Sequence, residues 1–192
     1  TGPKSGVHPM TNPQEQASWH AARVGRITAS AIHKIARRTT KGLPYAAYAE
    51  YQAEIVLERL TNSAASHYVT PAMEIGTQRE PEAALAYTME TGSKVAFSAF
   101  VDHPTVARSG ASPDRLVNDD GLLEIKCPQP KAHLDFLITG VIPPEYYWQM
   151  QWQMACTGRQ WCDLFYYNPD FPPHLQTRSV QIGRASCRER GR

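Results

Sequence analysis

A chain of 192 residues is long enough to bury one sizeable hydrophobic core, and its length fits a single domain. With 42% hydrophobic and 20% charged residues, the composition is that of an ordinary soluble globular protein, and no apolar run is long enough to predict a membrane span. The net charge of +2 comes from the last ten residues, because the chain before them carries 16 basic and 17 acidic side chains. Overall charge therefore neither favours nor excludes nucleic acid, and DNA binding has to be inferred from local features.

The two ends of the chain differ from its middle. Residues 1–17 form a polar leader for which disorder is expected. With neither an initiator Met nor an apolar signal-peptide core, the chain looks like a fragment of a longer reading frame. Residues 183–192 depart abruptly from the preceding sequence and resemble adapter-derived, non-native sequence. The expected domain therefore covers residues 18–182. Its cysteines form no CxxC pair and no cluster with histidine at zinc-ligand spacing. Their odd number suits reduced thiols in a cytoplasm.

Helix signals dominate the first part of this domain. Residues 11–42 predict two helices separated by a break at Gly25, and Thr28 or Ser30 is the expected cap of the second helix. Residues 44–62 carry a continuous apolar stripe and predict the clearest helix of the chain.

A further helix follows a predicted loop over residues 63–73. Residues 74–92 have a helical pattern that Gly92 closes, and Pro81 lies near its start or marks a kink. The helical signals end at this glycine.

Strand signals begin after it. Residues 94–102 and 106–117 predict strands, and residues 122–128 predict another after the Asp120-Gly121 hairpin turn. This part of the chain therefore reads as a β-meander.

The remainder alternates between the two types of element. Helices are expected over residues 131–140 and 143–158, and strands over residues 161–170 and 174–182. The order of helices, meander, helices and strands predicts an α/β or α+β fold with a central sheet of four or five strands.

One predicted hairpin gathers side chains that can carry chemistry. Alternate residues of a strand share a face, so Glu124 and Lys126 point to the same side of their strand. For a turn centred on residues 119–120, Asp114 of the partner strand falls opposite Ile125, within one residue of Glu124. Local geometry alone therefore predicts a cluster of two carboxylates and one ammonium.

Such a cluster is suited to a divalent cation. Two adjacent carboxylates raise each other's proton affinity unless a cation lies between them. Mg²⁺ binds one or two carboxylates, keeps several waters and contacts substrate phosphates, and a neighbouring ammonium can orient the attacking water. The alternative is that Glu124 and Lys126 are solvent-facing residues of an edge strand, with Asp114 in a turn.

The spacing of these residues resembles the PD-(D/E)XK nuclease signature, with "SPD" at residues 112–114 and "LEIKCP" at residues 123–128. Other blocks resemble, in the same order, the lambda exonuclease or YqaJ-type viral recombinase family: "SWHAARVGRITAS" from Ser18, "GTQREPEAALAY" from Gly76 and "YYWQMQWQMACTG" from Tyr146. The resemblance spans residues 18–180. It implies a PD-(D/E)XK (restriction-endonuclease-like) core, in which helices flank a mixed central β-sheet.

The resemblance also implies a metal site. In it, Asp114 and Glu124 would bind Mg²⁺, or Mn²⁺ in its place, together with the backbone carbonyl of Ile125. Lys126 would assist the attacking water.

Further roles follow from the same resemblance. Glu80 would complete the acidic site through a second ion or a water, and Gln149 would face the site from its helix. Arg23 and Ser30 match positions that bind the terminal 5′-phosphate of the substrate strand. The family often has Gly where this chain has Arg115, which would alter the turn or add a phosphate contact.

Residues 23–41 carry the one concentration of basic side chains outside the tail. For the group at 34–41, a charged helix face and a track for DNA phosphates explain the pattern equally well. For Arg23, the interpretation as a phosphate-binding residue is favoured.

The implied activity is that of a Mg²⁺-dependent 5′–3′ exonuclease acting on double-stranded DNA ends in phage-type recombination. The resemblance further implies a ring-shaped homotrimer, a single-strand annealing protein as partner, and the cytoplasm of a bacterial host rather than a membrane. The family continues into a further helix, so the domain over residues 18–182 is expected to be truncated at its C-terminus. Two alternatives stay open: an endonuclease on the same core, and a DNA-binding or assembly module with an inactive site.

Overall fold

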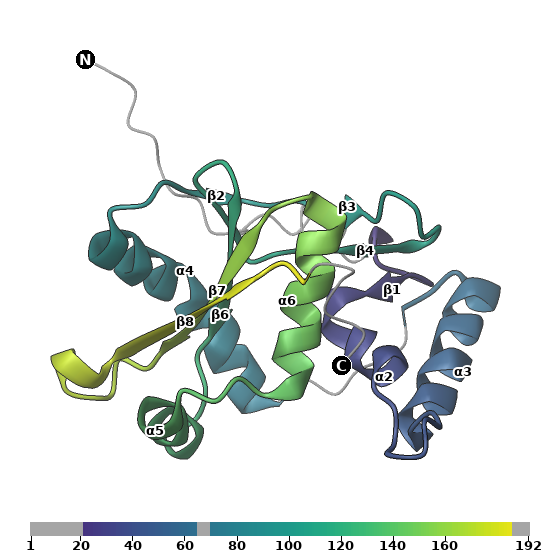
Figure 1. Ribbon diagram of the computed structural model, residues 1–192, viewed down its shortest axis with the longest axis horizontal. Helices are drawn as coiled ribbons and strands as arrows, with labels where there is room; N and C mark the ends of the chain where they lie inside the picture. The colour runs from purple at the N-terminus through teal and green to yellow at the C-terminus, as the bar shows by residue number, and fades with distance from the viewer. Residues whose placement is uncertain (1–20, 65–69, 186–192) are drawn as a thin grey trace.

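The structure, a computed structural model, describes residues 21–64 and 70–185 and is built around a mixed five-stranded sheet (Figure 1). The strand order is β2–β5–β6–β7–β8, in which β6 and β7 are parallel and all other neighbours are antiparallel. The strands are β2 (Val95–Phe97), β5 (Arg115–Val117), β6 (Gly121–Lys126), β7 (Trp161–Tyr167) and β8 (Thr177–Gly183). This arrangement confirms the predicted α/β core with a mixed central sheet.

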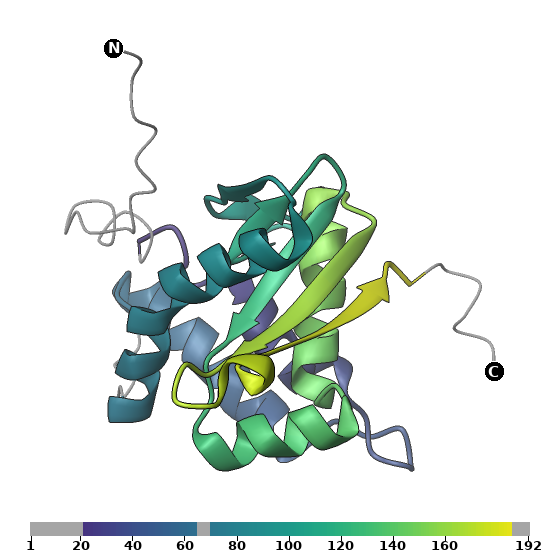
Figure 2. The same ribbon diagram turned by 90° about the vertical axis from the view of Figure 1, so that its left-hand side faces the viewer.

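Helices cover both faces of the central strands β6 and β7, as Figure 2 shows for α4 (Pro71–Thr91) on one side and α6 (Pro144–Thr157) on the other. Side chains of β6 alternate between the two: Leu123 and Ile125 pack in the cluster with α4, whereas Leu122 packs in the cluster with α6. Because residues two apart share a face, Glu124 points towards α6.

The longer helices end at residues in the left-handed conformation, and the end of α4 at Gly92 confirms the predicted stop. α4 ends at Gly92, α6 ends at Gly158, and α5 (Pro130–Thr139) ends at Gly140, each glycine with a positive φ. α3 (Ala46–Thr61) ends at Asn62, which also adopts the left-handed conformation. A short η2 turn (Pro173–Leu175) precedes β8. In the described part of the chain, no helix has the length and apolar character needed to cross a bilayer.

A second, smaller sheet was not predicted. Its order is β1 (Ile27–Thr28), β4 (Ser109–Ala111) and β3 (Val101–Asp102), with β1 parallel to β4. The second helix predicted for residues 11–42 is wrong at its start, because β1 and the 3-10 turn η1 (Ala29–Ala31) precede a short α2 (Ile32–Ala36). η1 and α2 pack against α6, which brings the N-terminal segment to the same side of the central sheet as Glu124.

Two caps and three boundaries also differ from expectation. Thr28 precedes η1 without a side-chain capping hydrogen bond, and Ser30 lies within η1. α4 begins at Pro71 rather than after residue 73, because the Thr70 hydroxyl accepts from the Met73 N–H at 3.2 Å. Pro81 therefore lies inside the helix. The strand expected over residues 94–102 is divided between β2 and β3, and the strand expected over residues 106–117 is divided between β4 and β5. In each case the two parts belong to different sheets.

The β5–β6 hairpin has a three-residue turn in which Asn118, not Asp120-Gly121, adopts the left-handed conformation. Gly121 begins β6, and any side chain there would collide with the indole of Trp161. Arg159 fixes the turn by donating to the carbonyls of Val117, Asn118 and Gly121 at 3.0, 3.1 and 2.7 Å. The register pairs Arg115 with Leu123, so one residue further along Asp114 lies opposite Glu124. The prediction, which set Asp114 opposite Ile125, is wrong by one position.

Residues 18–20 of the expected domain lie outside the described residues, as do the leader at residues 1–17 and the segment 186–192. At the C-terminal boundary, β8 runs through Gly183, which pairs with Trp161. The Arg184 N–H then donates to the Gln160 carbonyl at 2.8 Å.

Candidate active site

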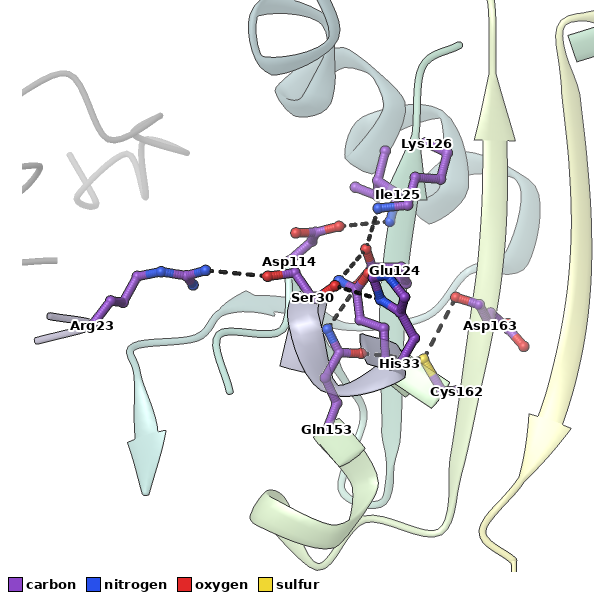
Figure 3. A network of polar contacts seen from close by, with 11 residues as sticks. Arg23, Ser30, His33, Asp114, Glu124, Ile125, Lys126, Gln153, Cys162 and Asp163 are labelled. Atoms are coloured by element: carbon purple, nitrogen blue, oxygen red, sulfur yellow. Dashed lines mark hydrogen bonds and ion pairs between the residues drawn. The ribbon is translucent and has the colours of Figure 1, made fainter. Parts of the chain in front are cut away.

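The carboxylate of Glu124 is at the centre of the site and is only 1% exposed (Figure 3). Its Oε1 accepts from Lys126 Nζ at 2.5 Å and from Gln149 Nε2 at 2.7 Å, and its Oε2 accepts from Gln153 Nε2 at 2.6 Å. Glu124 lies on a central strand, so the interpretation of Glu124 and Lys126 as solvent-facing residues of an edge strand is wrong. Three donors fix this carboxylate in one orientation.

Asp114 lies beside Glu124, immediately before β5. Its Oδ2 accepts from the Ile125 N–H at 2.7 Å, which ties the aspartate to the strand that carries Glu124. Burial, and then the negative charge of Glu124, raise the pKa of Asp114 well above its ordinary value, and Lys126 only partly opposes this rise. The positive charge of Lys126 therefore does not offset the burial of Asp114 and its repulsion by Glu124.

Lys126 supplies the ammonium of the site. Burial works to lower the pKa of Lys126, but the charges of Glu124 and Asp114 and the hydrogen bond to Glu124 outweigh it and raise that pKa. The ammonium also lies 4.6 Å from the centre of the Tyr146 ring. Lys126 is therefore held as a hydrogen-bond donor, and it is not placed to accept a proton.

The residues present fit a hard divalent cation. In the described part of the chain, no group of three or more His, Cys, Asp or Glu side chains is arranged to hold a metal ion. Two carboxylates with the neighbouring carbonyl of Ile125 would leave the remaining positions of Mg²⁺ to water and substrate oxygens, which is how Mg²⁺ is usually bound. A carboxylate has about four acceptor positions, and hydrogen bonds occupy three on Glu124, so one is left.

Glu80 reaches the site from α4 but is paired with Arg115. The guanidinium of Arg115 donates to Glu80 Oε1 at 2.7 Å and to the Asp114 carbonyl at 2.5 Å, and lies over the Phe97 ring at 5.8 Å. Glu80 is still close enough to contribute to the raised pKa of Asp114. Arg115 thus contacts an acidic residue of the site.

Arg23 and Ser30 come from the N-terminal segment and lie together at the edge of the site (Figure 3). The Arg23 guanidinium donates to Ser30 Oγ at 3.4 Å. Burial lowers the pKa of Arg23, while Tyr51, Asp114 and Glu58 act in the opposite direction, so the arginine is close enough to Asp114 to interact electrostatically.

A clamp on α3 holds the turn that follows Arg23. The Gly25 N–H donates to Glu58 Oε2 at 2.8 Å, and Arg59 Nε donates to the Gly25 carbonyl at 2.7 Å. Gly25 has a φ of 64°, and an added Cβ would lie 2.6 Å from Arg59 Cγ. The turn therefore requires glycine, both for its conformation and for this close approach.

The basic group at residues 34–41 makes local contacts. Lys34 lies over the Tyr51 ring at 5.1 Å, and Arg37 lies over the Tyr45 ring at 5.2 Å. These contacts agree with a charged helix face, and the phosphate track stays a prediction.

The residues expected at the site from sequence come together in the structure. Lys126 and Gln149 contact Glu124, and Glu80 lies close to Asp114. Arg23 and Ser30 lie together at the edge of the site. Sequence reasoning missed Gln153 and the pairing of Arg115 with Glu80. The spacing of Gln149 and Gln153, one helical turn apart, was the available signal, because residues four apart share a helix face.

Comparisons with known proteins give a family and related structures for this chain. The family model of the YqaJ-like viral recombinase domain matches residues 18–160. An alkaline exonuclease (LHK-Exo) from Laribacter hongkongensis is 43% identical with a TM-score of 0.81, over 88% of this chain and 82% of that one. Its structure in complex with dAMP gives 44% identity and a TM-score of 0.81, over 88% and 83%.

A phage-related exonuclease from Haemophilus somnus 129PT shares the fold, at 14% identity and a TM-score of 0.70 over 83% of this chain and 85% of that one. A search of curated proteins gives no match.

The repulsion between the two carboxylates predicts a gain in stability when one charge is removed. Asp114→Asn should raise the free energy of unfolding of the metal-free protein by roughly 1–2 kcal/mol, as seen when a strained active site is relieved. The asparagine Oδ1 can still accept from the Ile125 N–H. Urea titration in EDTA measures the effect.

The pH dependence has a defined sign. The pKa of Asp114 is raised in the folded state, so the folded protein binds a proton at Asp114 more tightly than the unfolded protein does. This proton stabilises the fold at low pH, and the stabilisation is lost as the pH rises through the raised pKa. The Asp114→Asn variant should lack this loss. Asp119→Asn, in the exposed turn of the same hairpin, is the control, and a less stable Asp114→Asn protein beside an unchanged control would contradict the prediction.

Proposed function

This chain belongs to the YqaJ-like viral recombinase domain family, and we propose that it is a Mg²⁺-dependent exonuclease that hydrolyses double-stranded DNA from 5′-phosphorylated ends. The observation that carries the proposal is the convergence of Asp114, Glu124 and the Lys126 ammonium at one site. The similarity to an alkaline exonuclease over most of both chains supports a nuclease. The intact set of three residues speaks against an inactive binding module.

The chemistry would be divided among few groups. Asp114, Glu124 and the Ile125 carbonyl would hold the ion, and Mn²⁺ can take the same oxygen donors. A bound Mg²⁺ supplies charge that lowers the pKa of a water and neutralises phosphate oxygens. Lys126, kept as an ammonium, would donate to the attacking water or to a phosphate oxygen. Gln149 keeps the carboxylate of Glu124 oriented from the partly exposed side of the site.

Arg23 and Ser30 are the basis for preferring DNA ends. A terminal phosphate carries more negative charge than an internal one, and a guanidinium binds phosphate oxygens with two parallel N–H groups. The position of Arg23 near Asp114 would set a bound terminal phosphate at a fixed distance from the reaction.

The family resemblance extends the proposal to assembly and biological setting. The enzyme would act as a ring-shaped homotrimer around DNA, together with a single-strand annealing protein in phage-type recombination in the bacterial cytoplasm. Light scattering coupled to size-exclusion chromatography measures the oligomeric state directly.

Digestion of end-labelled linear duplex DNA tests the proposed activity. With Mg²⁺, a duplex with 5′-phosphates should be degraded faster than one with 5′-hydroxyls, and a covalently closed circle should stay intact. EDTA should stop the reaction, and Mn²⁺ should restore it. Cutting of the closed circle would identify an endonuclease instead.

Lys126→Met keeps the aliphatic stem and removes the charge. We expect turnover to fall on the order of 10²- to 10³-fold, the scale for losing one donor to a transition state, with duplex DNA affinity nearly unchanged. Single-turnover cleavage and fluorescence anisotropy separate the two. Lys131→Met, on the exposed start of α5, is the control, and parental cleavage by Lys126→Met would show that its assigned role is wrong.

Arg23→Ala should reduce the preference for phosphorylated ends. The ratio of initial rates on 5′-phosphate and 5′-hydroxyl duplexes should fall towards one, because the guanidinium that would bind the terminal phosphate is gone. Lys94→Ala removes an exposed cation before β2 and should leave the ratio unchanged. An unaltered ratio in Arg23→Ala would remove the terminal-phosphate site from the mechanism.

A further inference from the structure

A second amide of α6 reaches Glu124 from inside the protein. Gln153 is fully buried, and its Nε2 donates to Glu124 Oε2 at 2.6 Å. Gln149, one turn earlier, is only partly buried and donates to the other oxygen at 2.7 Å. The two amides therefore hold different oxygens of one carboxylate, one from the interior and one from the open side.

The surroundings of Gln153 define which way its amide points. Its Oε1 faces the thiol of Cys162 on β7, with Sγ at 4.0 Å, and that sulfur also lies 3.8 Å from the Asp163 carbonyl. A thiol is a weak donor, whereas a carboxylate accepts only. A reversed amide would set its oxygen against the Glu124 carboxylate, so the Nε2 group must face Glu124 (Figure 3).

The donors on Glu124 determine what the carboxylate has left for a ligand. Lys126 and Gln149 share Oε1, and Gln153 is the donor on Oε2. Two acceptor positions on each oxygen leave one position, on Oε2. Gln153 is neutral, so it fixes this oxygen without adding a positive charge that would compete with a bound cation.

We propose that Gln153 is a positioning residue of the metal site, which holds Glu124 Oε2 from the protein interior so that its remaining acceptor position is presented to the divalent ion. The inference rests on the proposed metal-dependent function and deepens it. A buried glutamine that only satisfied a carboxylate would affect folding stability; a positioning residue affects metal affinity as well. Outer partners of metal ligands commonly change affinity or activity by about 10- to 100-fold.

Gln153→Met tests this inference, because methionine matches glutamine in length and removes the N–H donor. Mn²⁺ binding to the DNA-free protein, measured by electron paramagnetic resonance, should weaken by about 10-fold or more. The Mg²⁺ concentration for half-maximal cleavage should rise by a similar factor, with the KM for DNA unchanged. Circular dichroism confirms that the variant is folded.

Gln151→Met is a matched control on the same helix. Gln151 Nε2 donates to the Gly183 carbonyl at 2.9 Å, and its Oε1 accepts from the Ala185 N–H at 2.9 Å. Replacing Gln151 removes two hydrogen bonds of its amide, neither of which involves Glu124. Mn²⁺ affinity should therefore stay at the parental value, even where thermal stability falls.

A second variant guards against loss of folding. Gln153→Asn keeps a polar amide in the same place but withdraws the donor by one methylene, and it should also weaken Mn²⁺ binding. Parental Mn²⁺ affinity in either folded variant would overturn the positioning role while leaving the proposed nuclease intact. Absence of Mn²⁺ and Mg²⁺ binding in the parent would instead overturn the metal-dependent function itself.

Discussion

A carboxylate buried in the middle of the central sheet is the constraint on which this structure depends. β6 is covered on both faces, so Glu124 loses nearly all contact with water and must find partners within the protein. Two amides of α6 and the ammonium of Lys126 provide them. The packing of α6 on β6 is thus set by hydrogen bonds as well as by the apolar cluster of the same interface.

The site still carries an excess of negative charge, which suits it to a cation. Asp114 is bonded to the strand of Glu124, and its raised pKa reflects burial and the neighbouring carboxylate. Arg115 neutralises Glu80 and contacts the Asp114 carbonyl, so the strongest remaining repulsion is between Asp114 and Glu124. In the proposed metal-dependent function, stability and function would be opposed at this pair, because the repulsion that favours a divalent ion disfavours the metal-free fold.

The small sheet connects this site to the segment that would recognise a DNA end. β1 runs parallel to β4, and the chain leaves β4 only a few residues before Asp114. The clamp of Gly25 on α3 fixes the other end of the same segment. Arg23 and Ser30 are thereby held relative to the carboxylates by backbone pairing rather than by long side chains alone.

Sequence alone determined the features that depend on nearby residues. The helix α3, the Gly92 stop of α4, and the cluster of Asp114, Glu124 and Lys126 all follow from residue types and periodicity over a few residues. Only the tertiary structure decided the two-residue strand β1, the pairing of Arg115 with Glu80, the hairpin register and the contact of Gln153 with Glu124. These features join segments that are distant in the chain or depend on one residue of register, and local periodicity holds no information about which distant surfaces will meet.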